Sequence, residues 1–302
     1  MPEARVIRWL LDGDPAIRWQ VMRDLMDEPE AVFARERSRV ANEGWGKALL
    51  DRQAPEGWWH ANDRGWMITM DALALLREMG LDPASVAAQR AISRVKANLR
   101  WKSLGNRPYF DGETEACING AILAFGSYFG ERCDRIVDRL LGEQLADGGW
   151  NCEAPPSTRS SFNSTIRVLE GLLEFERAWG AGTAVTDARL KAQEYLLERR
   201  MFRRLSNGEV VNGAWTFFTF PTRWHYDVLR GLDYLRSAGV EPDERVAEAI
   251  GVVKARRGQD DGWPMDLLHE DRLGFPVETE TGKESRWNTL RALRVLRWYS
   301  RV

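Results

Sequence analysis

Apolar residues recur along this chain at spacings of three and four, which is the period of an amphipathic α-helix. The helical segments come in pairs, in which the first member is rich in charge and the second is mostly apolar. After an opening hairpin within residues 1–30, the predicted pairs are 31–53 with 66–79, 84–102 with 113–129, 131–144 with 160–179, 187–204 with 222–237, and 243–258 with 284–299. The pattern predicts an all-α fold of about twelve helices, with short strands conceivable only at 210–211 and 216–220.

The second helix of a pair has the broader apolar face. In the segment 66–79, for example, Ile68, Met70 and Leu73 are joined by further apolar residues on neighbouring faces. A helix of this kind is buried on several sides, and hairpins that repeat every ~45–65 residues must stack on their neighbours. We therefore expect an α/α toroid that forms one domain over residues 1–302, with second helices in an inner ring and first helices in an outer ring.

One motif recurs in the loops that join a first helix to a second helix. The stretches 53–59 and 144–150 both read Gln, three residues, Gly, one residue, aromatic. The stretch 209–215 keeps this spacing with Glu in place of Gln, 259–263 is a compressed version, and the loop before Gly112 lacks the motif.

This repeat resembles that of the terpenoid cyclase and protein prenyltransferase superfamily, the squalene-cyclase-like α/α toroids. The resemblance implies that the Gln and the aromatic residue tie neighbouring hairpins together. Independently, a buried Trp such as Trp150 removes about 150–250 Å² of surface from water and requires a partner for its indole N–H. The glycines permit positive φ at a tight chain reversal. We interpret the motif as structural, with the functional residues on the helix that follows it.

Composition narrows the class of protein. The 302 residues include 43 Lys and Arg against 45 Asp and Glu, for a formal net charge of −2, so no basic field indicates a nucleic-acid partner. No N-terminal signal peptide and no apolar run of the ~20 residues that span a membrane is visible. Cys117, Cys133 and Cys152 are an odd set without close spacing, which favours free thiols in a reducing compartment. A cytoplasmic protein of unknown oligomeric state is predicted.

Candidate functional residues are expected where the second helices begin, because these ends offer unpaired backbone N–H groups and the positive end of the helix dipole. The candidates for ligand binding are Trp66, Asp71, Asn163, Arg167, Arg223, Trp224, Arg286, Trp287 and Asn288. The candidates for catalysis are Asp111, Glu113, Glu115, His225 and Asp227. The resemblance implies a small hydrophobic, isoprenoid-like ligand in a central cavity, where aromatic walls can stabilise a carbocation.

The resemblance allows two chemistries. A terpenoid cyclase protonates an alkene with an Asp-Xaa-Asp-Asp motif, which is absent here; the nearest acidic cluster is Asp111, Glu113 and Glu115, where neighbouring carboxylates can share a proton. A protein prenyltransferase implies zinc bound by Asp-Xaa-Cys and His, for which Glu115, Cys117 and His225 are the weak counterparts. No organic cofactor is evident.

Two further classes stay open. Carbohydrate-processing α/α barrels use paired carboxylates and Trp, and this chain offers Asp63, Asp71, Glu115, Asp227, Asp266 and Glu278, with His60, His225 and His269 as candidate bases. A non-catalytic binding or scaffold toroid could hold an anionic group with Arg167, Arg223 and Arg286. Whether the protein is an enzyme is left open by the sequence.

Overall fold

Paired helices make up most of the protein, whose computed structural model describes residues 2–59, 65–180 and 182–300. The chain divides into two compact units, a first unit of Met1–Lys47 with Leu196–Val302 and a second unit of Ala48–Tyr195. The helices of the first unit are α1 (Pro2–Leu11), α2 (Pro15–Asp24), α3 (Glu30–Ser38), α11 (Val228–Ser237), α12 (Ala247–Ala255) and α13 (Arg286–Tyr299). The second unit contains α5 (Gly65–Glu78), α6 (Val86–Asn98), α7 (Ala116–Tyr128), α8 (Asp134–Gly142) and α9 (Phe162–Trp179), while α4 (Gly44–Leu50) and α10 (Thr183–Glu198) each include a unit boundary.

Strands are restricted to two short antiparallel pairs in the described residues: β1 (Arg100–Trp101) with β2 (Arg107–Pro108), and β3 (Trp263–Pro264) with β4 (Glu284–Ser285). The all-α class and the pairing of helices expected for an α/α toroid are therefore confirmed. The expectation of a single domain stays a prediction. Within the described part of the chain, no helix is both long and apolar enough to cross a lipid bilayer.

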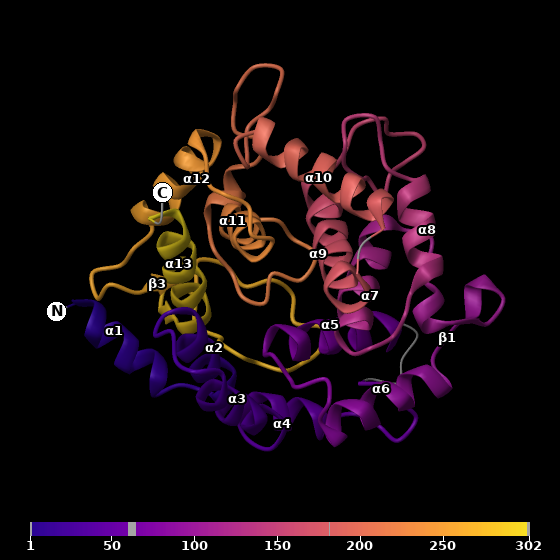
Figure 1. Ribbon diagram of the computed structural model, residues 1–302, viewed down its shortest axis with the longest axis horizontal. Coiled ribbons are helices and arrows are strands. Elements are labelled where there is room, and N and C mark those ends of the chain that lie inside the picture. Colours follow the sequence, from indigo (N-terminus) through magenta and orange to yellow (C-terminus); the bar gives the residue numbers. More distant parts are fainter. Residues whose placement is uncertain (1, 60–64, 181, 301–302) are drawn as a thin grey trace. The chain divides into compact units, whose positions relative to one another are not determined.

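The second unit is built around the close packing of α7 and α9. A Cβ added at Gly120 of α7 would lie 2.7 Å from the backbone of Arg167 in α9, and one at Gly171 would lie 2.5 Å from the Gly120 carbonyl oxygen. Only glycine lets two helices approach this closely. Helices α7 and α9 lie against each other in Figure 1. Cys152, in the loop before α9, contacts the first turns of both helices.

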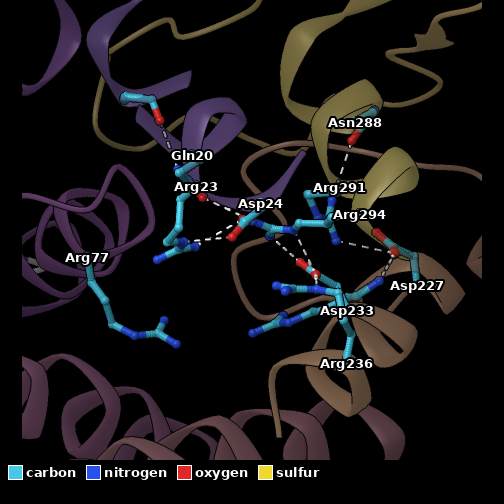
Figure 2. A network of polar contacts seen from close by, with 12 residues as sticks. Gln20, Arg23, Asp24, Arg77, Asp227, Asp233, Arg236, Asn288, Arg291 and Arg294 are labelled. Atoms are coloured by element: carbon cyan, nitrogen blue, oxygen red, sulfur yellow. Dashed lines mark hydrogen bonds and ion pairs between the residues drawn. The ribbon is translucent and has the colours of Figure 1, made fainter. Parts of the chain in front are cut away.

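In the first unit, the helices from the two ends of the chain pack together. Helix α13 lies beside α2 and α11, with α13 yellow and α2 indigo in Figure 1. Figure 2 shows the polar contacts at this junction, where Arg294 of α13 reaches Asp24 of α2 and Asp233 of α11. The three helices are therefore joined by charge as well as by their apolar faces.

The loop motif has the same geometry in its two complete copies. Gln144 Nε2 donates to the carbonyl oxygen of Gly148 at 2.7 Å and to that of Ala188 in α10 at 2.8 Å. Gln53 Nε2 makes the equivalent bonds to Gly57 at 3.2 Å and to Ala91 of α6 at 2.9 Å. Each Gln therefore closes its own loop and binds the first helix of the next pair.

The aromatic residue of the motif fastens the loop to the helix before it. The indole N–H groups of Trp59 and Trp150 each donate at 2.8 Å to the carbonyl oxygen ten residues earlier, Leu49 and Leu140. Trp263 repeats this bond to Val253 at 2.7 Å. The structural interpretation of the motif agrees with these contacts.

The copy at 259–263 is full-length and not compressed. Trp263 takes the place of Trp150, and the bond from Gly258 N to Gly262 O at 2.7 Å matches that from Leu145 N to Gly149 O at 2.9 Å. Counted from Trp263, Asp261 stands in the position of Gly148 and has φ +70°. The prediction was wrong because Asp tolerates this left-handed conformation and Arg257 stands where Gln was expected.

The copy at 209–215 is also misplaced in the prediction. Glu209 and Gly213 are exposed, and Gly213 begins a 3-10 turn. Arg203 instead performs the role of the Gln, because its guanidinium donates to the Gly208 carbonyl oxygen at 3.0 Å and pairs with Glu248 of α12. The donor therefore lies six residues before Glu209 and is Arg in place of Gln, with four residues between it and Gly208 where the complete motifs have three.

The predicted helix 31–53 and the predicted strand 216–220 also differ from the structure. The segment 31–53 is broken into α3, the 3-10 turn Arg39–Ala41 and α4, because Gly44 has φ +58° and its position leaves no room for a Cβ beside the Asp14 carboxylate. The expected strand 216–220 is not formed, whereas Val210 makes an isolated bridge with Arg203.

Replacing Gly148 by Ala is expected to destabilise the protein by more than about 1 kcal/mol, because φ is +95° and the new Cβ would lie 2.7 Å from the Lys191 carbonyl oxygen. Gly142→Ala is the matched control, since Gly142 is helical and has open space around it. Urea denaturation of both variants measures the difference, and equal midpoints would contradict the close contact.

Candidate functional site

A buried carboxyl group marks the start of α11 in the first unit. Asp227 is 2% exposed and caps the helix, since its Oδ1 accepts a hydrogen bond from the Arg230 backbone N–H at 2.7 Å. Its Oδ2 is buried without a hydrogen-bond partner. Burial raises the pKa of Asp227 above its ordinary value, outweighing the opposite effects of Arg291 and the backbone N–H groups. The carboxyl therefore keeps its proton to a higher pH than an exposed Asp and has one oxygen available for chemistry.

Arg291 of α13 links this carboxyl to a second candidate. Its guanidinium lies 3.7 Å from Asp227 Oδ1 and donates to the Thr219 carbonyl oxygen at 3.1 Å and to Asn288 Oδ1 at 3.4 Å. Asn288 is held in turn by donation from its Nδ2 to the Pro264 carbonyl oxygen at 2.9 Å. The structure thus brings Asp227 and Asn288 together through Arg291, which the sequence analysis missed. The available signal was a charged residue one turn after Trp287 on an apolar helix face.

Trp287 is enclosed by aromatic rings. It is 1% exposed and stacks on Phe220 at a centroid distance of 4.1 Å, with Trp45 at 6.3 Å. Phe220 directly follows Thr219, whose carbonyl oxygen holds Arg291. The stack therefore fixes the segment that orients the Arg291 side chain, and the ring of Trp287 itself serves packing.

The histidine candidate lies in a separate cluster of the same unit. The rings of His225 and His269 stack at a centroid distance of 3.5 Å. Burial, followed by the charges of His225, Arg223 and Arg230, lowers the pKa of His269 to about 4. His269 is therefore neutral at physiological pH, as a general base must be.

The remaining candidates of the first unit are engaged in contacts at or near the surface. Arg223 pairs with Asp271 at 2.6 Å, and Trp224 is 45% exposed. The Arg286 guanidinium lies over the Trp9 ring at 4.6 Å and donates to the Trp9 carbonyl oxygen at 3.1 Å. Neither arginine is positioned for an anionic ligand without giving up these contacts.

In the second unit, two thiols and a carboxylate converge at the start of α7. The ligating atoms of Glu115, Cys117 and Cys152 all lie within 4.8 Å of one another. The Cys117 backbone N–H donates to Cys152 Sγ at 3.2 Å, and Cys152 Sγ lies 3.3 Å from Ser164 Oγ in the first turn of α9. Sequence analysis treated Cys152 as an isolated thiol, because 35 residues separate it from Cys117.

The two thiols titrate differently because they share a hydrogen bond. Donation from the Cys117 thiol lowers the pKa of Cys152 to about 7, against the effect of burial and with help from Ser164. The same hydrogen bond, together with burial, raises the pKa of Cys117. Cys152 therefore ionises at a lower pH than Cys117, and the Cys117 backbone N–H at the start of α7 favours its thiolate.

The acidic candidates beside this cluster have separate partners. Asp111 lies 3.8 Å from Arg135. Glu113 accepts from the backbone N–H of Glu115 at 2.8 Å, and Asn119 bonds to the Glu113 backbone in both directions. These contacts order the loop that leads into α7.

The other candidates of the second unit surround Tyr109. Its hydroxyl donates to the Trp66 carbonyl oxygen at 3.0 Å, and its pKa is raised well above the ordinary value by burial and by Asp71, against the charge of Arg167. Asp71 and Arg167 are buried on α5 and α9, and Asn163 is half-buried in the first turn of α9. Tyr109 therefore interacts with three of the sequence candidates: it donates a hydrogen bond to Trp66, and the charges of Asp71 and Arg167 shift its pKa.

The zinc hypothesis joins residues from both units, since Glu115 and Cys117 belong to the second unit and His225 to the first. That ligand set stays a prediction. His60 and Asp63, candidates of the carbohydrate hypothesis, lie outside the described residues.

Comparison with known proteins yields matches of structure alone. No protein-family model and no curated protein matches the chain. Among solved structures, it is similar to the type II terpene cyclase MstE from Scytonema in its apo form, at 18% identity and a TM-score of 0.44, covering 94% of this chain and 88% of that one. The R337A variant of MstE in complex with geranylgeranyl dihydroxybenzoate matches at 18% identity and a TM-score of 0.46, with 95% and 87% covered.

Proposed function

We propose that this protein binds a hydrophobic, isoprenoid-like ligand and that Asp227 donates a proton to it, as the acid of a terpenoid-cyclase-like reaction. The observation that carries the proposal is the Asp227 carboxyl, which is buried, has a raised pKa and keeps Oδ2 without a hydrogen-bond partner. The chain would then use a single buried acid in place of an Asp-Xaa-Asp-Asp motif.

Protonation of a carbon–carbon double bond requires an acid shielded from water and a conjugate base that its surroundings stabilise. Burial of Asp227 meets the first requirement. For the second, the Arg230 backbone N–H and the Arg291 guanidinium lie 2.7 and 3.7 Å from Oδ1 and can stabilise the carboxylate once the proton has left. Arg291 is therefore proposed to position and stabilise the acid, held in turn by Asn288 and the Thr219 carbonyl oxygen.

Asp227→Asn is the decisive variant. Because Asn is as good a helix N-cap as Asp, the start of α11 is expected to survive the substitution. Turnover of linear polyprenes or isoprenoid diphosphates is expected to fall by about 10²–10⁴-fold, the usual contribution of a general acid, while binding of the same compounds in a thermal-shift assay persists. Asp243→Asn is the matched control, because Asp243 also caps a helical turn, from an exposed position.

The pH dependence provides a second measurement. Since the pKa of Asp227 is raised, its acid form is present below that pKa and turnover is expected to fall as pH rises through it. The same shift means that Asp227 contributes stability at low pH that is lost as pH rises, so Asp227→Asn is expected to be at least as stable as the wild type near neutrality.

Three outcomes decide among the functional classes. Binding of polyprenes with turnover that depends on Asp227 supports the proposal. Binding without any turnover in wild type and variant alike would assign the chain to non-catalytic binding proteins. Stabilisation by oligosaccharides and not by isoprenoids would replace the proposal by a carbohydrate-active one.

A further inference from the structure

We infer that Glu115, Cys117 and Cys152 form a binding site for a borderline-soft divalent cation of the Zn²⁺ class. The inference concerns the second unit alone and does not rest on the function proposed for Asp227. Among the described residues, these form the one group of three or more His, Cys, Asp or Glu side chains whose ligand atoms are close enough to share an ion.

One pair of donor atoms already has the spacing that a tetrahedral ion requires, and the third donor lies close by. Zinc–sulfur bonds of about 2.3 Å and zinc–oxygen bonds of about 2.0–2.2 Å place neighbouring ligand atoms roughly 3.3–3.8 Å apart. Cys117 Sγ already lies 3.6 Å from Glu115 Oε2, and the whole group lies within 4.8 Å. The inference requires the donors to approach one another by about 1 Å at most, and the side chains of Cys117 and Cys152 are half-exposed.

Hydrogen bonds from neighbouring groups orient the donor atoms, as is usual for metal ligands. Ser164 Oγ lies 3.3 Å from Cys152 Sγ and accepts from the Cys152 backbone N–H at 3.3 Å, which fixes the loop against α9. The backbone N–H of Cys117 points at the same sulfur from 3.2 Å. Outer contacts of this kind orient the ligands and contribute to affinity.

Charge at the site favours a cation. One carboxylate and two thiolates carry a formal charge of −3, and the buried guanidinium of Arg167 lies near enough to act on Cys117. A divalent ion would bring the sum to zero, with both thiol protons released to solvent on binding. Three protein ligands leave a fourth position for water or for a heteroatom of a ligand, which is typical of catalytic more than of purely structural sites.

The test uses the full-length chain without a histidine tag, reduced with a phosphine and stripped by a chelator. Wild type is expected to bind one equivalent of Zn²⁺ in competition with a chromogenic chelator, and Co²⁺ is expected to give a thiolate-to-cobalt charge-transfer band. Cys117→Ser and Cys152→Ser should each weaken binding by at least ~100-fold, the upper range for loss of a supporting contact, and remove or diminish the band. Cys133→Ala is the control, because Cys133 is buried in another part of the unit and bonds to the Glu131 carbonyl oxygen.

Glu115→Gln keeps the test decisive if a cysteine variant fails to fold, because Glu115 is exposed and its loss is expected to weaken Zn²⁺ binding without unfolding the protein. Absence of a bound equivalent in wild type would overturn the inference. So would unchanged affinity in both cysteine variants, or a Cys117–Cys152 disulfide that persists under the reducing conditions.

Discussion

Replacing Arg294 by Met is expected to lower the free energy of unfolding by about 3–5 kcal/mol, the usual cost of removing one partner from a buried ion pair. The Arg294 side chain is 12% exposed, and its guanidinium donates to Asp233 at 2.8 Å, lies 3.5 Å from Asp24 and donates to Gln20 at 3.0 Å (Figure 2). Without it, two carboxylates buried between α2, α11 and α13 lose a shared countercharge. Urea denaturation at neutral pH measures the loss.

The pH dependence of that loss is set by the two carboxylates. Burial alone would raise the pKa of Asp233, but Arg294 and Arg236 outweigh it and hold the value well below the ordinary range. The pKa of Asp24 is lowered in the same way, against burial, by Arg23 and Arg294. Groups with lowered pKa contribute stability above their unfolded value, near 3.8, that is lost as pH falls through the folded value. The deficit of Arg294→Met is therefore expected to shrink in acid.

Arg39→Met is the matched control, because Arg39 forms an exposed pair with Glu43 at 2.8 Å. Exposed pairs contribute little, so its denaturation midpoint should be close to that of the wild type. A neutral-pH stability of Arg294→Met equal to that of this control would show that the buried network contributes nothing net.

Trp150→Ala is expected to cost about 3–5 kcal/mol, the range for truncating a buried aromatic residue. Trp150 is fully buried, its indole N–H donates to Leu140 at 2.8 Å, and its backbone N–H donates to Thr165 Oγ1 at 3.0 Å. The variant would lose the ring that fills the space between loop and helices and would leave the Leu140 carbonyl oxygen without this donor.

Two comparisons separate these contributions in thermal and urea unfolding. Trp150→Phe keeps most of the apolar volume and removes the donor, so a loss of about 1–3 kcal/mol is expected. Trp179→Ala tests an exposed ring at the end of α9, where an effect within about 0.5 kcal/mol is typical. Full stability of Trp150→Ala would refute the structural interpretation of the motif.

The helices and their pairing were predictable because apolar spacing records which faces are buried, and this signal is spread over many residues. The complete motifs were also readable, since Gln and Trp have few substitutes for two bonds in fixed directions. Arg203 was not, because a guanidinium performs the same donation from a residue type that usually indicates a solvated surface. Asp261 was missed for a similar reason, since a left-handed conformation is rare outside glycine.

Much of the candidate site depends on tertiary contacts that a linear pattern does not contain. Cys152 contacts Cys117 across the packing of α7 on α9, which Gly120 and Gly171 permit and which the sequence spacing does not reveal. Asp227 was predicted from its place at a helix start, but its value as an acid comes from burial beside Arg291, which is positioned by an irregular segment at Thr219. The local sequence was therefore enough to select Asp227 and Cys117, but not the residues that lie against them in space, Arg291 and Cys152.

The bonds from Gln53 and Gln144 end on the main-chain oxygens of Ala91 and Ala188. A main-chain acceptor is present whatever residue occupies its position, as long as the helix persists. Each bond between a loop and the next helix therefore depends on the side chain of one partner only. The loop must keep its donor, whereas the receiving helix can change its side chains as far as packing allows. Successive hairpins can diverge in sequence independently and still be assembled in the same register.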